Sequence, residues 1–106
     1  MSLNIFLSGI QMLEDNTFPE GPVAIDCEMV GVEEKRKGAL ARVSIVAYDG
    51  TVLYDVISQP TEKITDYRTR WSGIRPLDME RAIPFEIVKE QVQKILKVGR
   101  FFIINI

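Results

Sequence analysis

The chain has 106 residues, of which 46% are hydrophobic and 26% are charged, and its net charge is −2. A chain of this length forms one small domain, and its charge excludes an overall basic field that attracts nucleic acid. The absence of histidine excludes the commonest general base, and a single cysteine, Cys27, excludes an internal disulfide.

We expect residues 1–21 to form a lead-in segment before the first strand. They have neither a positively charged start nor a long apolar run. We therefore expect no signal peptide, no membrane-spanning helix and no membrane partner. The lone Cys27 fits a reducing, intracellular compartment, and its commonest role is that of a small buried hydrophobe.

Residues 23–29 predict a buried strand that two acids interrupt. Alternation along a strand places Asp26 and Glu28 on one face and Cys27 on the other. Two buried carboxylates repel each other and need a positive partner, and oxygen ligands suit Mg²⁺ or Mn²⁺. The alternative is an edge strand whose acids point into water.

Two further strands, 39–48 and 51–58, flank Asp49-Gly50, a two-residue hairpin signal, and predict an antiparallel meander. Before them, the mixed-charge segment 32–38 is either a solvated connection or a phosphate contact made by its basic triplet. Arg42 either pairs with an acid or is solvated. On the second strand, alternation places Ala41, Val43, Ile45 and Ala47 on one face, and Leu40, Arg42, Ser44 and Val46 on the other.

Residues 59–74 predict a loop that contains Tyr67, Arg68, Arg70 and Trp71. Guanidinium groups bind phosphates and aromatic rings stack on bases, so this loop is a candidate single-strand nucleic-acid contact. A well-packed surface loop has the same composition, and both interpretations stay open.

The last third predicts a short helix from Pro76 to Arg81, a longer amphipathic helix from near Pro84 to a stop at Gly99, and a buried strand over 101–106. A strand that follows a crossover helix lies parallel to the first strand. The fold class is therefore α/β: a three-stranded antiparallel meander plus a parallel fourth strand.

Four segments resemble the DEDDh 3′→5′ exonucleases, within them the branch of RNA exonuclease 4 and the interferon-stimulated exonucleases. They are Ala24-Ile25-Asp26-Cys27-Glu28-Met29-Val30-Gly31, 40–46, 52–55 and 64–74, in that order. The resemblance implies a ribonuclease H-like fold and makes 22–106 the N-terminal part of an exonuclease domain.

The resemblance also implies site residues. Asp26 and Glu28 correspond to catalytic carboxylates that hold two divalent ions, Mg²⁺ or Mn²⁺, in the complete family site. Met29 lies near the sugar of the terminal nucleotide, and Arg68 contacts that nucleotide. The implied substrate is the 3′ end of RNA or single-stranded DNA, and the implied location is the nucleus or nucleolus.

The pattern then departs from the family, because a third carboxylate, a histidine and a fourth carboxylate are not found. We therefore expect a truncated fold that binds at most one ion weakly and is inactive or nearly so. Two alternatives stay open. One is a non-catalytic module that binds nucleic acid or protein through the loop 68–71, and the other is a chain without a stable fold.

Overall fold

The computed structural model describes residues 21–96 and 102–105; most of the lead-in segment and the Gly99 stop lie outside them. The elements in chain order are β1 (Val23–Val32), β2 (Lys37–Ala47), β3 (Val52–Gln59), β4 (Ile64–Asp66), α1 (Thr69–Ser72), the 3₁₀ helix η1 (Pro76–Arg81), β5 (Ile83–Pro84), α2 (Phe85–Leu96) and β6 (Phe102–Asn105). No helix in this part of the chain is long and apolar enough to cross a bilayer.

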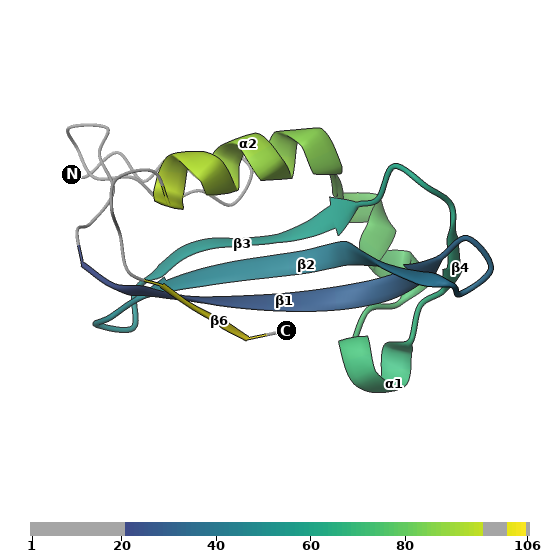
Figure 1. The fold of residues 1–106 in the computed structure, drawn as a ribbon, viewed down its shortest axis with the longest axis horizontal. Coiled ribbons are helices and arrows are strands. Elements are labelled where there is room, and N and C mark those ends of the chain that lie inside the picture. The colour runs from purple at the N-terminus through teal and green to yellow at the C-terminus, as the bar shows by residue number, and fades with distance from the viewer. Residues whose placement is uncertain (1–20, 97–101, 106) are drawn as a thin grey trace.

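The sheet is built on the predicted meander (Figure 1). β1 pairs antiparallel with β2, and β2 pairs antiparallel with β3. On the other edge of β1, β6 runs parallel to residues 23–26, and β4 pairs antiparallel with residues 31 and 32. The fold prediction of a meander with a parallel strand after a crossover helix is therefore confirmed, and β1 is an interior strand, not an edge strand.

Helix α2 covers one face of the sheet, and α1 lies on the opposite side (Figure 1). Alternate residues of the strands fill the space under α2, because successive side chains point to opposite faces. This main core contains Val23, Ile25, Val43, Ile45, Ala47, Leu53, Tyr54, Val56, Val88 and Ile95. The Tyr54 hydroxyl donates to Gln91 Oε1 on α2, and burial raises the pKa of Tyr54 to about 12.

A second cluster packs the segment from β4 to η1 against the meander. Its buried residues are Val30, Ala41, Ile57 and Ile74. Glu28 on β1 pairs with Arg42 on β2, but the next residue, Met29, pairs with Leu40. The register between β1 and β2 therefore shifts after Glu28. The prediction that Leu40 shares a face with Arg42 is wrong, since this irregularity turns Leu40 toward the main core and Ala41 into the second cluster.

The two charged and aromatic segments also differ from the predicted loops. The connection between the first two strands is only a turn, and its basic triplet is partly paired: Lys37 Nζ lies 2.7 Å from Glu62 Oε1. The predicted loop 59–74 contains β4 and the single turn α1. The short helix at Pro76–Arg81 is confirmed, as a 3₁₀ helix.

Candidate active site

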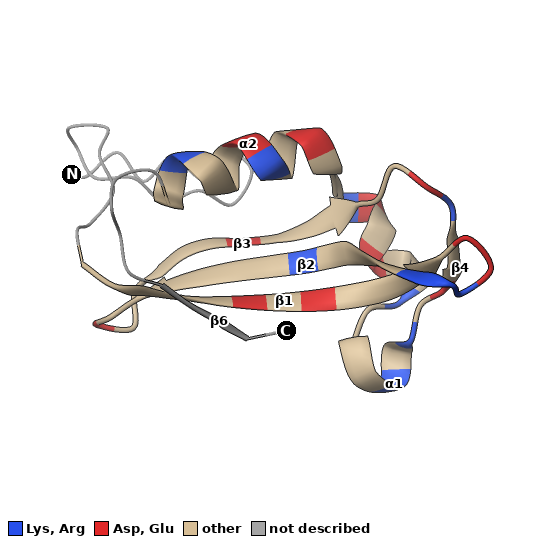
Figure 2. Ribbon diagram, in the orientation of Figure 1, with Lys and Arg blue, Asp and Glu red and all other residues tan. Residues whose placement is uncertain are grey.

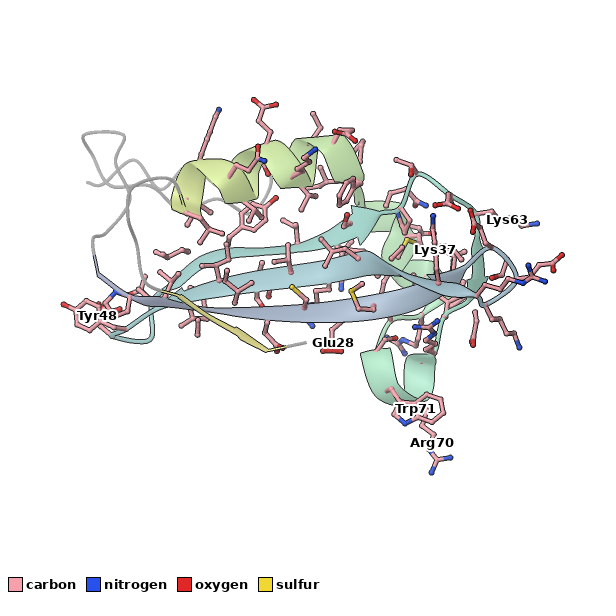
Figure 3. All side chains as sticks on the ribbon, viewed as in Figure 1. Glu28, Lys37, Tyr48, Lys63, Arg70 and Trp71 are labelled. Atoms are coloured by element: carbon pink, nitrogen blue, oxygen red, sulfur yellow. The ribbon has the colours of Figure 1, made fainter. Side chains whose placement is uncertain are left out.

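The two acids lie in the middle of β1, on the face that α2 does not cover. Asp26 pairs across the sheet with Ser44, and Glu28 pairs with Arg42. Asp26 is exposed and Glu28 half-buried, while Cys27 between them packs against the main core. Figure 3 shows Glu28 on the side of the sheet from which Arg70 and Trp71 project. The predicted shared face of the acids is confirmed.

Arg42 balances part of this negative charge, but it is bound to a third acid. Its Nε donates to Asp55 Oδ1 at 2.9 Å and its Nη2 to Asp55 Oδ2 at 2.8 Å. The hydrogen bond to Asp55 and the charges of Asp55, Glu28 and Asp26 raise the pKa of Arg42 against the effect of burial. Three carboxylates thus face one guanidinium on this surface, and the excess of negative charge favours a cation.

Cys27 forms an uncharged part of the site. Burial raises the pKa of the Cys27 thiol, and the charges of Asp26 and Glu28 raise it further. The thiol therefore stays protonated at neutral pH, and the side chain packs against the main core on the face opposite to the acids. The interpretation of Cys27 as a small buried hydrophobe is thus right in its packing partner, but the residue is half-buried.

A cleft of about 410 Å³ joins the predicted site residues. It is lined by Asp26, Cys27, Glu28, Met29, Arg68, Trp71 and Ser72. One wall is thus β1 and the other is α1 with the residue before it. The volume lies in the range of about 300–1,000 Å³ that is typical of small-ligand sites. All four residues proposed from the sequence, Asp26, Glu28, Met29 and Arg68, therefore meet in one place.

Two glycines position Arg68, a feature that sequence reasoning missed. Gly31 on β1 and Gly38 on β2 are cross-strand partners. A Cβ atom added to Gly31 would lie 3.2 Å from both Nε and Nη2 of Arg68, and one added to Gly38 would lie 3.5 Å from Nη1. The guanidinium therefore rests on a surface without side chains. The only sequence signal was a glycine at each end of the charged turn.

The main chain fixes the direction from which Arg68 enters the cleft. Arg68 adopts a left-handed conformation with φ 50°, and its N–H donates to Asp66 Oδ1 at 3.1 Å. Ser72, the lining residue that the sequence did not indicate, has a structural role. Its hydroxyl donates to the Tyr67 carbonyl and accepts from the Ile74 N–H, so it ties together the two segments that flank α1.

Asp26 and Glu28 fit a divalent ion as two of its ligands. Their carboxylates are oxygen donors at alternating positions beside an open cleft, which suits Mg²⁺ or Mn²⁺. The charge of Glu28 acts on Arg42 and on Cys27. In the same part of the chain, no group of three or more acidic, cysteine or histidine side chains is arranged to hold a metal.

Comparisons with known proteins agree with the fold. A family model described as Exonuclease (RNase_T) matches residues 23–105. Interferon-stimulated 20 kDa exonuclease-like 2 of Bos taurus is 57% identical over 79 residues, which are 74% of this chain and 23% of that protein. RNA exonuclease 4 of Xenopus laevis is 51% identical over 76 residues, which are 71% of this chain and 18% of that protein.

The Saccharomyces cerevisiae Pan2 pseudoubiquitin hydrolase–RNA exonuclease module, solved in complex with AACCAA RNA, is similar in structure, with a TM-score of 0.71 and 26% identity. The match covers 89% of this chain and 19% of that one. The chain thus spans about a fifth of the length of these relatives. Its α/β sheet is ribonuclease H-like, and the chain belongs to the exonuclease family.

Proposed function

We propose that this chain supplies part of the active site of a metal-dependent 3′→5′ exonuclease that acts on RNA, with single-stranded DNA as the other candidate substrate. The observation that carries the proposal is the cleft in which Asp26, Glu28, Met29 and Arg68 meet. The names of the relatives and the RNA bound to the similar Pan2 module support RNA as the substrate.

Each side chain has a distinct role in this proposal. Asp26 and Glu28 hold Mg²⁺ or Mn²⁺, which when bound activates water and stabilises the charge on the phosphate. Arg68 donates hydrogen bonds to phosphate or sugar oxygens of the 3′-terminal nucleotide. Met29 packs its flexible, apolar side chain against the sugar. The walls from β1 and α1 keep the end of the strand between these groups.

The isolated 106-residue chain should be a poor catalyst. It has no histidine to act as a general base, and its described residues offer two carboxylates where the family's full site uses four. We expect it to bind one divalent ion weakly and to release no detectable mononucleotides from labelled RNA. Release that Asp26→Asn abolishes would show that the chain alone is active.

Paramagnetic broadening by Mn²⁺ tests the metal site directly. Adding Mn²⁺ to the ¹⁵N-labelled chain should selectively broaden the amide signals around Asp26 and Glu28, and Asp26→Asn or Glu28→Gln should remove the effect. Glu90→Gln is the matched control, because Glu90 lies on α2, over the other face of the sheet. Broadening centred elsewhere, or unaffected by the β1 variants, would contradict the proposal.

A second candidate function is a non-catalytic module that binds nucleic acid through residues 68–71. It is favoured by Trp71, which is 77% exposed although it lines the cleft. This function predicts RNA binding that falls with salt and survives loss of Asp26 and Glu28. Binding that Arg68→Ala and Arg70→Ala together leave unchanged would exclude it.

A further inference from the structure

The exposed indole of Trp71 lies on a turn that several hydrogen bonds hold together. The N–H groups of Trp71 and Ser72 both donate to the Arg68 carbonyl at 2.8 Å, and the N–H of Gly73 donates to the Thr69 carbonyl at 2.9 Å. The Thr69 hydroxyl donates to the Ile74 carbonyl, and Ile74 is buried in the second cluster. The turn is therefore anchored on its inner side while Trp71 points outward.

Trp71 differs from the other exposed apolar side chains by its place. Tyr48, Val52, Leu77 and Ile87 are also exposed, but they do not line the cleft. Single exposed apolar residues are normal on protein surfaces. A large aromatic ring at the rim of a cleft that also contains two carboxylates and an arginine is a different case, because it adds a flat apolar surface to a polar site.

Arg70 completes the geometry of this rim. Its guanidinium carbon lies 5.5 Å from the centroid of the Trp71 ring, within the range of a cation–π contact, and both side chains project from α1 on the same side (Figure 3). Lys and Arg residues lie on α1 and near β4, where acidic residues are mixed with them, and two acidic positions lie on the adjacent β1 (Figure 2). A ligand that offers both a flat ring and phosphates suits this surface.

We propose that Trp71 is a stacking platform for an unpaired nucleobase of the strand whose 3′ end lies in the cleft. The inference rests on the proposed function and deepens it, since it adds a base-binding position to the same site. Every base has a stacking face, so the platform tolerates any base but requires one. A 3′ end in a duplex keeps its bases stacked and paired, so single-stranded ends are selected.

The tryptophan itself reports on this contact, because the chain contains only one. We would titrate the chain in EDTA with a uridine hexamer and follow Trp71 fluorescence, expecting saturable quenching. A series of hexamers, each with one abasic position, should then include one or two positions where the affinity falls about 5- to 100-fold. Equal affinity across the series would overturn the proposal.

Variants separate stacking from charge and from folding. By fluorescence anisotropy of labelled RNA, Trp71→Leu should weaken binding to the same extent as the abasic position, and Trp71→Phe should restore most of it. Tyr48→Leu, at an equally exposed aromatic residue outside the cleft, is the control and should change nothing. Unchanged affinity in Trp71→Leu, or equal quenching by inorganic tripolyphosphate, would show that no base is bound.

The test does not depend on the metal site. Quenching in EDTA that persists in Asp26→Asn, together with no selective Mn²⁺ broadening, would overturn the exonuclease proposal and keep the stacking platform. Mn²⁺ broadening at β1 without quenching would do the reverse.

Discussion

The two faces of the sheet differ although the same strands build both. The face under α2 is apolar, with Val23, Ile25 and Cys27 of β1 turned toward Val88 and Ile95. The opposite face carries Asp26 and Glu28 on β1 and the Arg42–Asp55 ion pair on β2 and β3. A period of two thus lets neighbouring residues serve different purposes: one set stabilises the fold and the other binds ligands.

The comparison predicts that substitutions on the two faces have separable effects. Removal of side chains under α2 should lower the free energy of unfolding, which is only about 5–15 kcal/mol in small domains. Substitutions on the open face should change ligand affinity and leave stability nearly constant, since exposed charges contribute little to it.

The largest effect is expected for Ile95→Ala on the covered face. Ile95 is 2% exposed, and its truncation leaves a cavity that should cost about 2–5 kcal/mol. Ile87→Ala on the same helix is the control, because Ile87 is 42% exposed and should cost less than about 1 kcal/mol. Urea denaturation of both variants measures the difference, and equal losses would show that α2 does not pack as described.

Alkaline pH should lower the free energy of unfolding, because Tyr54 is buried under α2. Burial raises the pKa of Tyr54 to about 12, above the value of about 10 in an unfolded chain. The folded state therefore holds the proton more tightly. The protonated Tyr54 hydroxyl contributes on the order of 2 kcal/mol to the free energy of unfolding. This contribution is complete below pH 10 and is lost as the pH rises to 12. Tyr54→Phe should abolish this part of the pH dependence, and identical profiles would contradict it.

A smaller effect on stability, but a large one on binding, is expected for Gly31→Ala. The new Cβ would lie 3.1 Å from Asp66 Cβ and 3.2 Å from Arg68 Nε, so Arg68 must move. We expect a loss of about 1 kcal/mol in stability and RNA binding as weak as that of Arg68→Ala. Gly38→Ala, whose Cβ comes no closer than 3.5 Å to Arg68, should bind RNA more tightly than Gly31→Ala.

The smallest effect on stability is expected for Asp55→Asn on the open face. This change should alter the free energy of unfolding by less than about 1 kcal/mol. Without the ion pair, Arg42 can approach Glu28, its cross-strand partner. The positive charge of Arg42 should then weaken Mn²⁺ binding about fivefold, which is the effect of two unit charges about 4 Å apart in water. Arg42→Gln should strengthen Mn²⁺ binding. Equal Mn²⁺ affinity in both variants would contradict this role of the ion pair.

Local patterns predicted much of the fold. Alternation placed Asp26 and Glu28 together, because it depends only on neighbouring residues. Asp49-Gly50 predicted the hairpin but not its length. β2 ends at Ala47 and β3 begins at Val52, the Gly50 N–H donates to the Ala47 carbonyl, and only Gly50 of the pair has a positive φ, of 92°, so the connection is longer than the predicted two residues. The amphipathic stripe predicted α2, and the crossover rule predicted that β6 is parallel to β1.

Features that depend on distant contacts could not be predicted in this way. The register shift that turns Leu40 inward depends on the pairing of β1 with β2, not on a pattern within either strand. The turn α1 is too short for a periodic signal and begins after Arg68 in a left-handed conformation. The packing of the Arg68 guanidinium on Gly31 and Gly38 brings together residues that are far apart in the sequence.

The edge of β1 that β6 and β4 share has a consequence for amide exchange. β6 pairs with residues 23–26 and β4 with residues 31 and 32, so among the described strands none pairs with residues 27–30 on that edge. Cys27, Glu28 and Met29 of this stretch line the cleft. Among the described strands, this stretch of β1 thus has a pairing partner on one side only, so its amide protons should exchange faster than those along the rest of β1.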